Sequence, residues 1–407
     1  MPNMYISFLL NFFQPVTQSH KVLVRIADEC YLPLAELFNS DLDPRFTLSV
    51  SRSLIQLLHD CGKDEVIVKL KNAVQRGHIE IMHSGAHHPI FPLISETEVN
   101  RQIELDIQYK NAMLGDIPKR GIFSPELCYK DELVPLYQEL GFQWTIIDDQ
   151  LMEMYNIPRS DGYIYHIDDF YIFMRSSLWS DKITRREENW TGKNFLEHLN
   201  AEAQARDRDC YIIFAIAAET FGHHIKYYDE TFLRQMLYAI QDYDSIQLCR
   251  ISDLLHNTLE EERIQKSRVN HPDFDFFPPS SWATLPVDAR RGDYYPIMKS
   301  KGNPIHERLW ELTDLILEST RDIPWGNNRN RDLRKLLDQA FYSCQYFWAS
   351  FWYWNPDLVH MGIELQMRAL YKCVGLTDNM HLLEEGERLY TELIWEIAQR
   401  EKEVKGG

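Results

Sequence analysis

Short apolar runs alternate with segments of helical periodicity through the first part of the chain. Apolar runs of buried-strand character cover residues 5–12, 46–50 and 211–216. Apolar residues recur at helical spacing over 18–39, 53–61, 64–76 and 229–243. Alternating residues over 162–175 predict a strand pair, and 246–250 a last short strand. This alternation predicts an α/β fold with a largely parallel sheet.

The second part of the chain reads as helical. Near His271 the composition changes to prolines and clustered aromatic residues, and helical spacing then continues from Asn303 to the end. At 407 residues the chain is long enough for one large domain with an appended part. We therefore predict an α/β domain over 1–270 and an aromatic-rich loop with a helical domain over 271–407.

One apolar run ends abruptly in reactive side chains. The strand-like stretch that begins at Tyr211 leads directly into Glu219, Gly222, His223 and His224. Parallel barrels deliver catalytic groups from the carboxyl ends of their strands in this way. We expect the functional site at this point of the fold.

The same stretch resembles the fourth signature motif of glycoside hydrolase family 57. In that family a strand ends in Asp-x-Glu-Thr-Phe-Gly-His-His, and the Asp is the catalytic general acid/base. Residues 219–224 match the motif, but Ala217 stands at the position of the Asp. Because the other motif residues, 219–224, are intact, we favour an introduced Asp-to-Ala change over natural loss of the acid. Either origin predicts a chain that is inactive or nearly so.

A second stretch resembles the third motif of the family, Gly-x-x-x-Pro-Glu. It begins at Gly121, and the resemblance makes Glu126 the nucleophile. Alone, a Glu after Pro would more often be a charge at a helix amino terminus. The strand that follows ends in Asp148 and Asp149. Each of them could bind sugar or cap the next helix.

Residues 77–93 resemble the second motif, in which Gly-x-x-Glu opens a strand and Ser-Gly-Ala-x-His-Pro forms a loop at the substrate. The resemblance implies substrate contacts from Glu80, His87 and His88. His83 and His87 also have the H-x-x-x-H spacing of metal ligands, as in carbohydrate deacetylases with a related barrel. The first strand offers no acidic residue to complete such a site, so we expect no metal and no cofactor.

The first strand resembles the His-Gln-Pro motif of the family only in part. Gln14 and Pro15 are kept, whereas Asn11 and Phe13 stand where the family has histidines. We expect Gln14 to contact substrate. Further candidate contacts are Arg175 and Trp179, with packing as the alternative for both, together with Glu219, His223, His224, Trp282 and, from the aromatic run 347–354, Trp348.

The resemblance implies an incomplete (β/α)7 barrel with a C-terminal α-helical bundle. It also implies a retaining hydrolase or transglycosylase for α-glucans, or in some members for α-galactosides. A catalytically silent carbohydrate-binding protein and a metal-dependent carbohydrate deacetylase are the alternatives.

Net charge and cysteine content indicate which partners and which cellular compartment to expect. The net charge of -18 argues against nucleic acid and anionic membranes, because phosphate binding needs clustered Lys and Arg. The seven cysteines are scattered without a C-x-x-C pair, as expected of free thiols in a reducing cytoplasm. No basic region precedes the first apolar run, so we expect a strand there and not a signal peptide. The oligomeric state stays open.

Overall fold

The computed structural model describes residues 2–155, 157, 162–185, 190–255, 265–268, 277–321, 323, 325 and 330–406. The chain forms two compact units. The first comprises Met1–Gln14, Gln18–Ala86 and Phe91–Trp282, and the second Pro15–Thr17, His87–Ile90 and Ala283–Gly407. The boundary predicted near His271 lies outside the described residues, so it stays a prediction.

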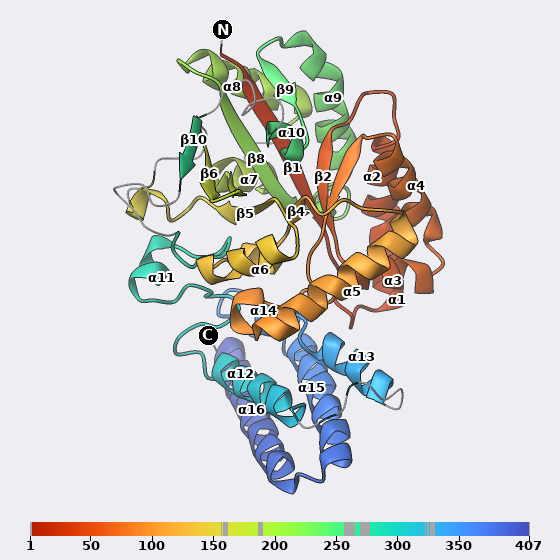
Figure 1. Ribbon diagram of the computed structural model, residues 1–407, viewed down its shortest axis with the longest axis vertical. Helices are drawn as coiled ribbons and strands as arrows, with labels where there is room; N and C mark the ends of the chain where they lie inside the picture. Colours follow the sequence, from red (N-terminus) through yellow and green to blue (C-terminus); the bar gives the residue numbers. More distant parts are fainter. Residues whose placement is uncertain are drawn as a thin grey trace. The chain divides into compact units, whose positions relative to one another are not determined.

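The first unit is built around seven parallel strands (Figure 1). They are β1 (Met4–Phe12), β2 (Phe46–Val50), β3 (Ile79–Met82), β4 (Gly121–Ile122), β5 (Trp144–Asp148), β7 (Phe170–Arg175) and β8 (Cys210–Ala217). Neighbours pair in the order β1-β2-β3 and β4-β5-β7-β8-β1. A bridge between His83 and Ile122 joins β3 to β4. The ring is therefore nearly closed, and the predicted (β/α)7 barrel is confirmed.

Three further strands extend this sheet. β6 (Tyr163–Ile167) runs antiparallel to β7, which confirms the predicted strand pair, and β10 (Gln265–Arg268) pairs with β6. β9 (Ile246–Leu248) pairs with Met4–Ile6 of β1, whereas β2 pairs with β1 from Leu9 onward. β9 thus pairs with the amino-terminal part of β1, and β2 pairs with its carboxyl-terminal part.

Helices follow most strands of the barrel. They are α1 (His20–Ile26), α2 (Leu32–Leu37), α3 (Arg52–Asp60), α4 (Asp64–Gln75), α5 (Glu96–Leu114), α6 (Val134–Glu139), α7 (Ser177–Thr184), α8 (Gly192–Gln204), α9 (Gln235–Ala239) and α10 (Ile251–Leu254). A π-helical turn, Ala27–Tyr31, joins α1 to α2, and a second, Asp229–Arg234, precedes α9. Ser19, Ser51 and Ser95 each cap a helix by accepting a backbone N–H.

Strand alternation separates an outer core from the barrel interior. Met4, Ile6, Phe8 and Leu10 of β1 pack outward among the helices. Tyr5 and Leu9 pack inward with Trp144, Ile146, Phe173, Tyr211 and Ile213. Toward the carboxyl ends, the next inward positions are Asn11 on β1, Asp148 on β5 and Arg175 on β7, whereas β8 continues with Ala215 and then Ala217. The interior therefore changes from apolar to polar at the rim where the site was predicted.

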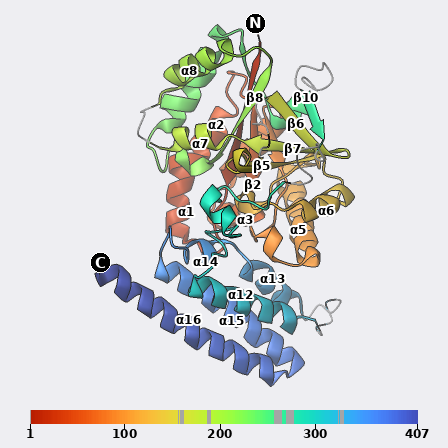
Figure 2. The same cartoon turned by 90° about the vertical axis from the view of Figure 1, so that its left-hand side faces the viewer.

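The second unit confirms the predicted C-terminal helical region. It contains α11 (Pro286–Arg290), α12 (Pro304–Ser319), α13 (Arg331–Ala340), α14 (Cys344–Phe347), α15 (Pro356–Thr377) and α16 (Met380–Gly406). Figure 2 shows α12, α15 and α16 lying side by side. Trp310 stacks on Tyr346 at 4.1 Å, and the Gln366 amide donates to Thr313 at 2.8 Å. Across the described residues, no helix is apolar over a length that would cross a bilayer.

The contact of α8 with the segment before α9 leaves no room for a side chain at Gly192. A Cβ there would lie 2.1 Å from Met236 N and 2.2 Å from Phe232 O. Because backbone atoms cannot move aside cheaply, Gly192→Ala should lower the free energy of unfolding by about 1–3 kcal/mol. Helical Gly375 has open space around it, so Gly375→Ala should raise that free energy by up to about 1 kcal/mol. Urea unfolding of both variants checks this, and equal effects would contradict it.

Candidate active site

Glu126 lies in a strained turn beyond β4. Its backbone has φ 60° and ψ 22°, and Leu127 follows with φ 50°. Left-handed conformations cost energy in residues with a Cβ and cluster at functional sites. The Ser124 carbonyl accepts from Leu127 N at 2.9 Å, and the Pro125 carbonyl from Cys128 N at 3.1 Å. These bonds hold Glu126 in a fixed turn whose neighbouring residues, Ser124, Leu127 and Cys128, are buried.

The carboxylate of Glu126 is bound by Trp282. The indole Nε1 donates to Oε2 at 2.7 Å, and Trp282 N donates to the Glu126 carbonyl at 3.4 Å. The Gln150 amide in turn donates to the Trp282 carbonyl at 2.9 Å. Burial raises the pKa of Glu126, and the Trp282 hydrogen bond opposes that rise. Trp282, predicted as a substrate contact, is thus a hydrogen-bond partner of the predicted nucleophile.

A buried ion pair on α5 anchors the start of this turn. Asp106 accepts from Lys110 Nζ at 2.7 Å and from Ser84 N at 2.9 Å, and all three residues are buried. The Ser84 hydroxyl donates to the Phe123 carbonyl at 2.8 Å. Sequence reasoning missed Asp106 and Lys110, because a charged pair four residues apart on a helix is usually exposed to solvent.

His83 packs into the same buried cluster. Its Nε2 lies 3.2 Å from the Ile117 carbonyl and its Nδ1 lies 3.4 Å from Asp106 Oδ2. His87, the other histidine of the H-x-x-x-H spacing, belongs to the second unit. The part of the chain that the structure describes contains no group of three His, Cys, Asp or Glu residues that could hold a metal ion.

Ala217 ends β8 with its side chain exposed at the rim. Its register partner on β1 is Asn11. β7 ends at Arg175, opposite Ile213 of β8. Beyond this point, side chains take the place of β7 as hydrogen-bond partners of the β8 backbone. Arg175 Nε donates to the Ala215 carbonyl at 3.1 Å, while Ala215 N donates to Ser180 Oγ at 3.2 Å. The position of Ala217 is therefore fixed from both sides of β8.

Arg175 and Asp148, two of the predicted sugar contacts, form an ion pair with each other. Arg175 Nη1 donates to Asp148 Oδ2 at 2.5 Å, and Nη2 donates to Asp181 Oδ1 at 2.9 Å. With Nε bound to the Ala215 carbonyl, each of the three guanidinium nitrogens makes a hydrogen bond within the protein. Burial raises the pKa of Asp148 to about 7, and the Arg175 charge opposes that effect. Both side chains hold β5, β7 and β8 together. Asp149 Oδ1 accepts from Ser177 N, the first residue of α7, at 2.9 Å.

Glu219 and Gln14 meet beside the end of β8. The Gln14 amide donates to Glu219 Oε1 at 2.8 Å, and the Tyr31 hydroxyl donates to the same oxygen. Burial raises the pKa of the Glu219 carboxyl. The sequence indicated both Gln14 and Glu219, but it gave no signal for Tyr31, which comes from the π-helical turn.

The Gly-His-His part of the fourth motif packs against that π-helical turn. Gly222 has φ 119°, and a Cβ there would lie 2.1 Å from the Glu29 carbonyl oxygen. His223 Nδ1 lies 2.6 Å from Glu29 Oε2, and His224 N donates to the Glu219 carbonyl at 2.8 Å. The glycine thus permits the close approach that fixes both histidines at the rim.

Two predicted substrate contacts lie elsewhere in the first unit. Glu80 is near the amino end of β3, where Oε1 accepts from Thr47 Oγ1 at 2.8 Å and from Ser252 N at 3.0 Å. Trp179 is buried in the outer core, edge-on to Phe195 at 6.0 Å. Both side chains have structural partners, and substrate binding by either residue stays a prediction.

Three candidates belong to the second unit. His88 Nδ1 lies 3.0 Å from Ser343 Oγ, and its carbonyl accepts from Ser343 N at 3.1 Å. Burial lowers the pKa of His88 to about 3. His87 is also buried, and Trp348 lies edge-on to Phe347 at 5.0 Å. Substrate binding by these three residues stays a prediction.

Known proteins resemble this chain in sequence and in fold. An alpha-amylase from Pyrococcus horikoshii is 23% identical to this chain over an alignment that covers 70% of this chain and 44% of the relative. Alpha-amylase 1 from Dictyoglomus thermophilum is 28% identical over an alignment that covers 40% of this chain and 24% of the relative. The chain thus spans less than half the length of these two relatives. In structure, the alpha-amylase AmyC from Thermotoga maritima gives a TM-score of 0.69 at 15% identity, covering 98% of this chain and 97% of that one.

The 4-alpha-glucanotransferase from Thermococcus litoralis gives a TM-score of 0.70 at 17% identity, covering 91% of this chain and 60% of that one. At such identities the likeness shows the fold alone. The family comes from the sequence, because residues 7–268 match the model of glycosyl hydrolase family 57. This range includes most of β1, the Glu126 turn and the loop after β8. The chain belongs to glycosyl hydrolase family 57.

Proposed function

We propose that the rim of the barrel is an α-glucan site of a retaining glycosidase or transglycosylase, with Glu126 as nucleophile and the acid/base missing at Ala217. The observation that carries this proposal is the turn of Glu126, whose strained backbone is held by hydrogen bonds and whose carboxylate is bound by Trp282. Relatives named as alpha-amylases and 4-alpha-glucanotransferases support the substrate class.

Retention requires two carboxyl groups about 5 to 5.5 Å apart. Glu126 would attack the anomeric carbon, form a glycosyl ester and release the aglycone oxygen. That oxygen needs a proton, and the water or sugar that later cleaves the ester needs a base. The methyl group of Ala217 supplies neither. Because acid/base assistance is worth about 10²- to 10⁴-fold, we propose that the chain turns over natural glucans very slowly or not at all.

Glu219 is a poor replacement for the missing acid. The expectation that it lies on the same side as Ala217 requires the strand to continue, but β8 passes into a 3-10 turn, Ala218–Thr220. Tyr31 and Gln14 already bind its Oε1. We propose that Glu219 supports the shape of the rim.

A catalytically silent carbohydrate-binding protein is the second candidate function. Asn11 differs from the histidine of the first motif, and it is the register partner of Ala217. Two neighbouring rim positions therefore depart from the family pattern, as expected where binding persists without turnover.

Restoring the acid separates the two candidates. In the first, Ala217→Asp should raise the rate of maltooligosaccharide cleavage or transfer about 10²- to 10⁴-fold, because the aspartate can protonate the leaving oxygen. Product analysis on a maltooligosaccharide ladder measures this. Ala217→Asn is the matched control, with similar size and no acid, and it should stay at the level of the original chain. A silent binder would bind the ladder in all three forms without turnover.

The pH profile of the Ala217→Asp variant reports on Glu126. The nucleophile must be ionised, so activity falls as the pH drops through its pKa, which burial raises above that of an ordinary glutamate. Trp282→Phe removes a donor that stabilises the carboxylate, so it should move the acid limb of kcat/KM to higher pH. Trp179→Phe is the control and should leave the limb in place. A limb that Trp282→Phe leaves unchanged or lowers would contradict this assignment.

A further inference from the structure

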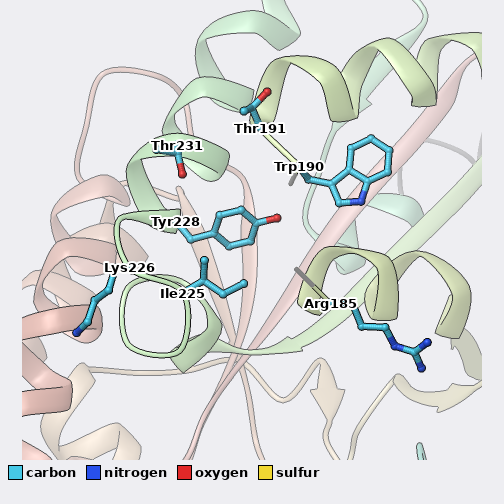
Figure 3. A pocket seen from close by; sticks show the side chains of 7 residues that line it. All are labelled: Arg185, Trp190, Thr191, Ile225, Lys226, Tyr228 and Thr231. Carbon is cyan, nitrogen blue, oxygen red and sulfur yellow. The ribbon is translucent and has the colours of Figure 1, made fainter. Parts of the chain in front are cut away.

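A pocket of about 460 Å³ opens beside the loop that follows β8 (Figure 3). Trp190 and Thr191, at the start of α8, form one wall, and Tyr228 and Thr231 form another. Ile225, which comes directly after His224, completes it on the side of the fourth motif. All these residues belong to the first unit.

The Trp190 indole gives the pocket an unused donor. The side chain is only 5% exposed, yet its Nε1 has no hydrogen-bond partner among the described residues. Buried N–H groups are almost always paired with protein, water or ligand. The indole N–H is therefore a buried donor beside the pocket that lacks a partner among the described residues.

The Tyr228 hydroxyl offers complementary acceptor capacity. Figure 3 shows it pointing across the pocket toward Trp190. It donates to the Ile183 carbonyl at 3.3 Å, and its oxygen lone pairs can still accept. The Tyr228 ring stacks on Phe221 at 5.5 Å with an interplanar angle of 10°, so it is held rigidly. Two aromatic rings, one donor and one acceptor suit a sugar, which presents C–H faces and hydroxyls together.

The charges around the pocket are already balanced. Lys226 Nζ lies 2.6 Å from Glu29 Oε1, and Arg185 Nη2 lies 3.4 Å from Asp181 Oδ2. In Figure 3 both side chains extend away from the space between Trp190 and Tyr228. A phosphate or carboxylate would therefore find little uncompensated positive charge, which favours a neutral ligand.

We propose that this pocket binds a glucose unit of an α-glucan at a second sugar site outside the barrel. Trp190 and Tyr228 pack in the outer core, whereas the Glu126 neighbours Phe123, Leu127 and Trp282 pack in the interior cluster. The two sites therefore lie on different sides of the sheet. The glucan identity of the ligand rests on the proposed function. A glucan held here would lie next to the loop that carries the fourth motif.

Calorimetric titration of the full chain with maltotriose tests the second site. We expect two equivalents of sugar bound. Thr231→Trp places a large side chain in the pocket and should reduce the stoichiometry to one. Thr391→Trp is the matched control, because both threonines are exposed helical residues whose hydroxyls donate to the carbonyl four residues earlier at 2.9 Å. Trp190→Phe keeps a ring without the N–H and should weaken this site about three- to tenfold.

The outcomes separate this proposal from the rim site. If Thr231→Trp still binds two equivalents of maltotriose, the second site is overturned. It is also overturned if the chain binds one equivalent that only Trp282→Ala removes. That second result leaves the rim proposal intact. A single equivalent that only Thr231→Trp removes would support the pocket and count against glucan binding at the rim. No binding in any form would overturn both. Inorganic phosphate binding that Thr231→Trp abolishes would show an anion site and overturn the sugar assignment.

Discussion

The geometry of the rim depends on the parallel pairing of β1 with β8. The two strands are in register over the whole of β8, from Met4 opposite Cys210 to Asn11 opposite Ala217. Because parallel strands in register end at the same level, the segments that follow them emerge together. The hydrogen bond between Gln14 and Glu219 joins those two segments. Slipping this pairing by one residue would turn Ala217 from the interior to the outer core.

Two other constraints place side chains around this pairing. Arg175 links Asp148 of β5, Asp181 of α7 and the backbone of Ala215, so it holds three elements at a point where β7 has ended. Gly222 lets the loop after β8 approach the Glu29 carbonyl more closely than any residue with a Cβ could. Glu126 completes the rim from the turn after β4. The site is thus assembled by buried polar contacts and a tight backbone approach, and not by the apolar core alone.

Much of the fold was predictable from periodicity. The strands from Met4, Phe46 and Cys210 and the helical second unit were all indicated, since strong hydrophobic patterns survive in most contexts. The family motifs indicated Glu126, and they also indicated Gln14 and Glu219, which the structure brings together. The second motif placed Glu80 at the opening of a strand, as the structure does, but its bonds to Thr47 and Ser252 could not be read from that motif. Glu80 is the second residue of β3, which places it at the opposite end of the barrel from the rim.

Other parts of the site could not be read from the sequence. Arg175 and Trp179 looked like sugar contacts, but a buried ion pair and core packing depend on residues distant along the chain. Tyr31, Asp106 and Lys110 carry no motif, because their roles come from the close packing of helices against the rim. The Trp282 hydrogen bond to Glu126 joins a loop to a turn 156 residues away.

We propose Glu126 as a nucleophile in a site that lacks an acid/base. An α-maltosyl fluoride tests it directly, because fluoride leaves without a proton and the first step can proceed in this chain. The glycosyl ester should then accumulate, since Ala217 offers no base to activate water. Mass spectrometry of the intact chain and of its peptides should find one maltosyl group on the peptide that contains Glu126, and none after Glu126→Gln. Absence of the adduct, or an adduct on another residue, would contradict the account.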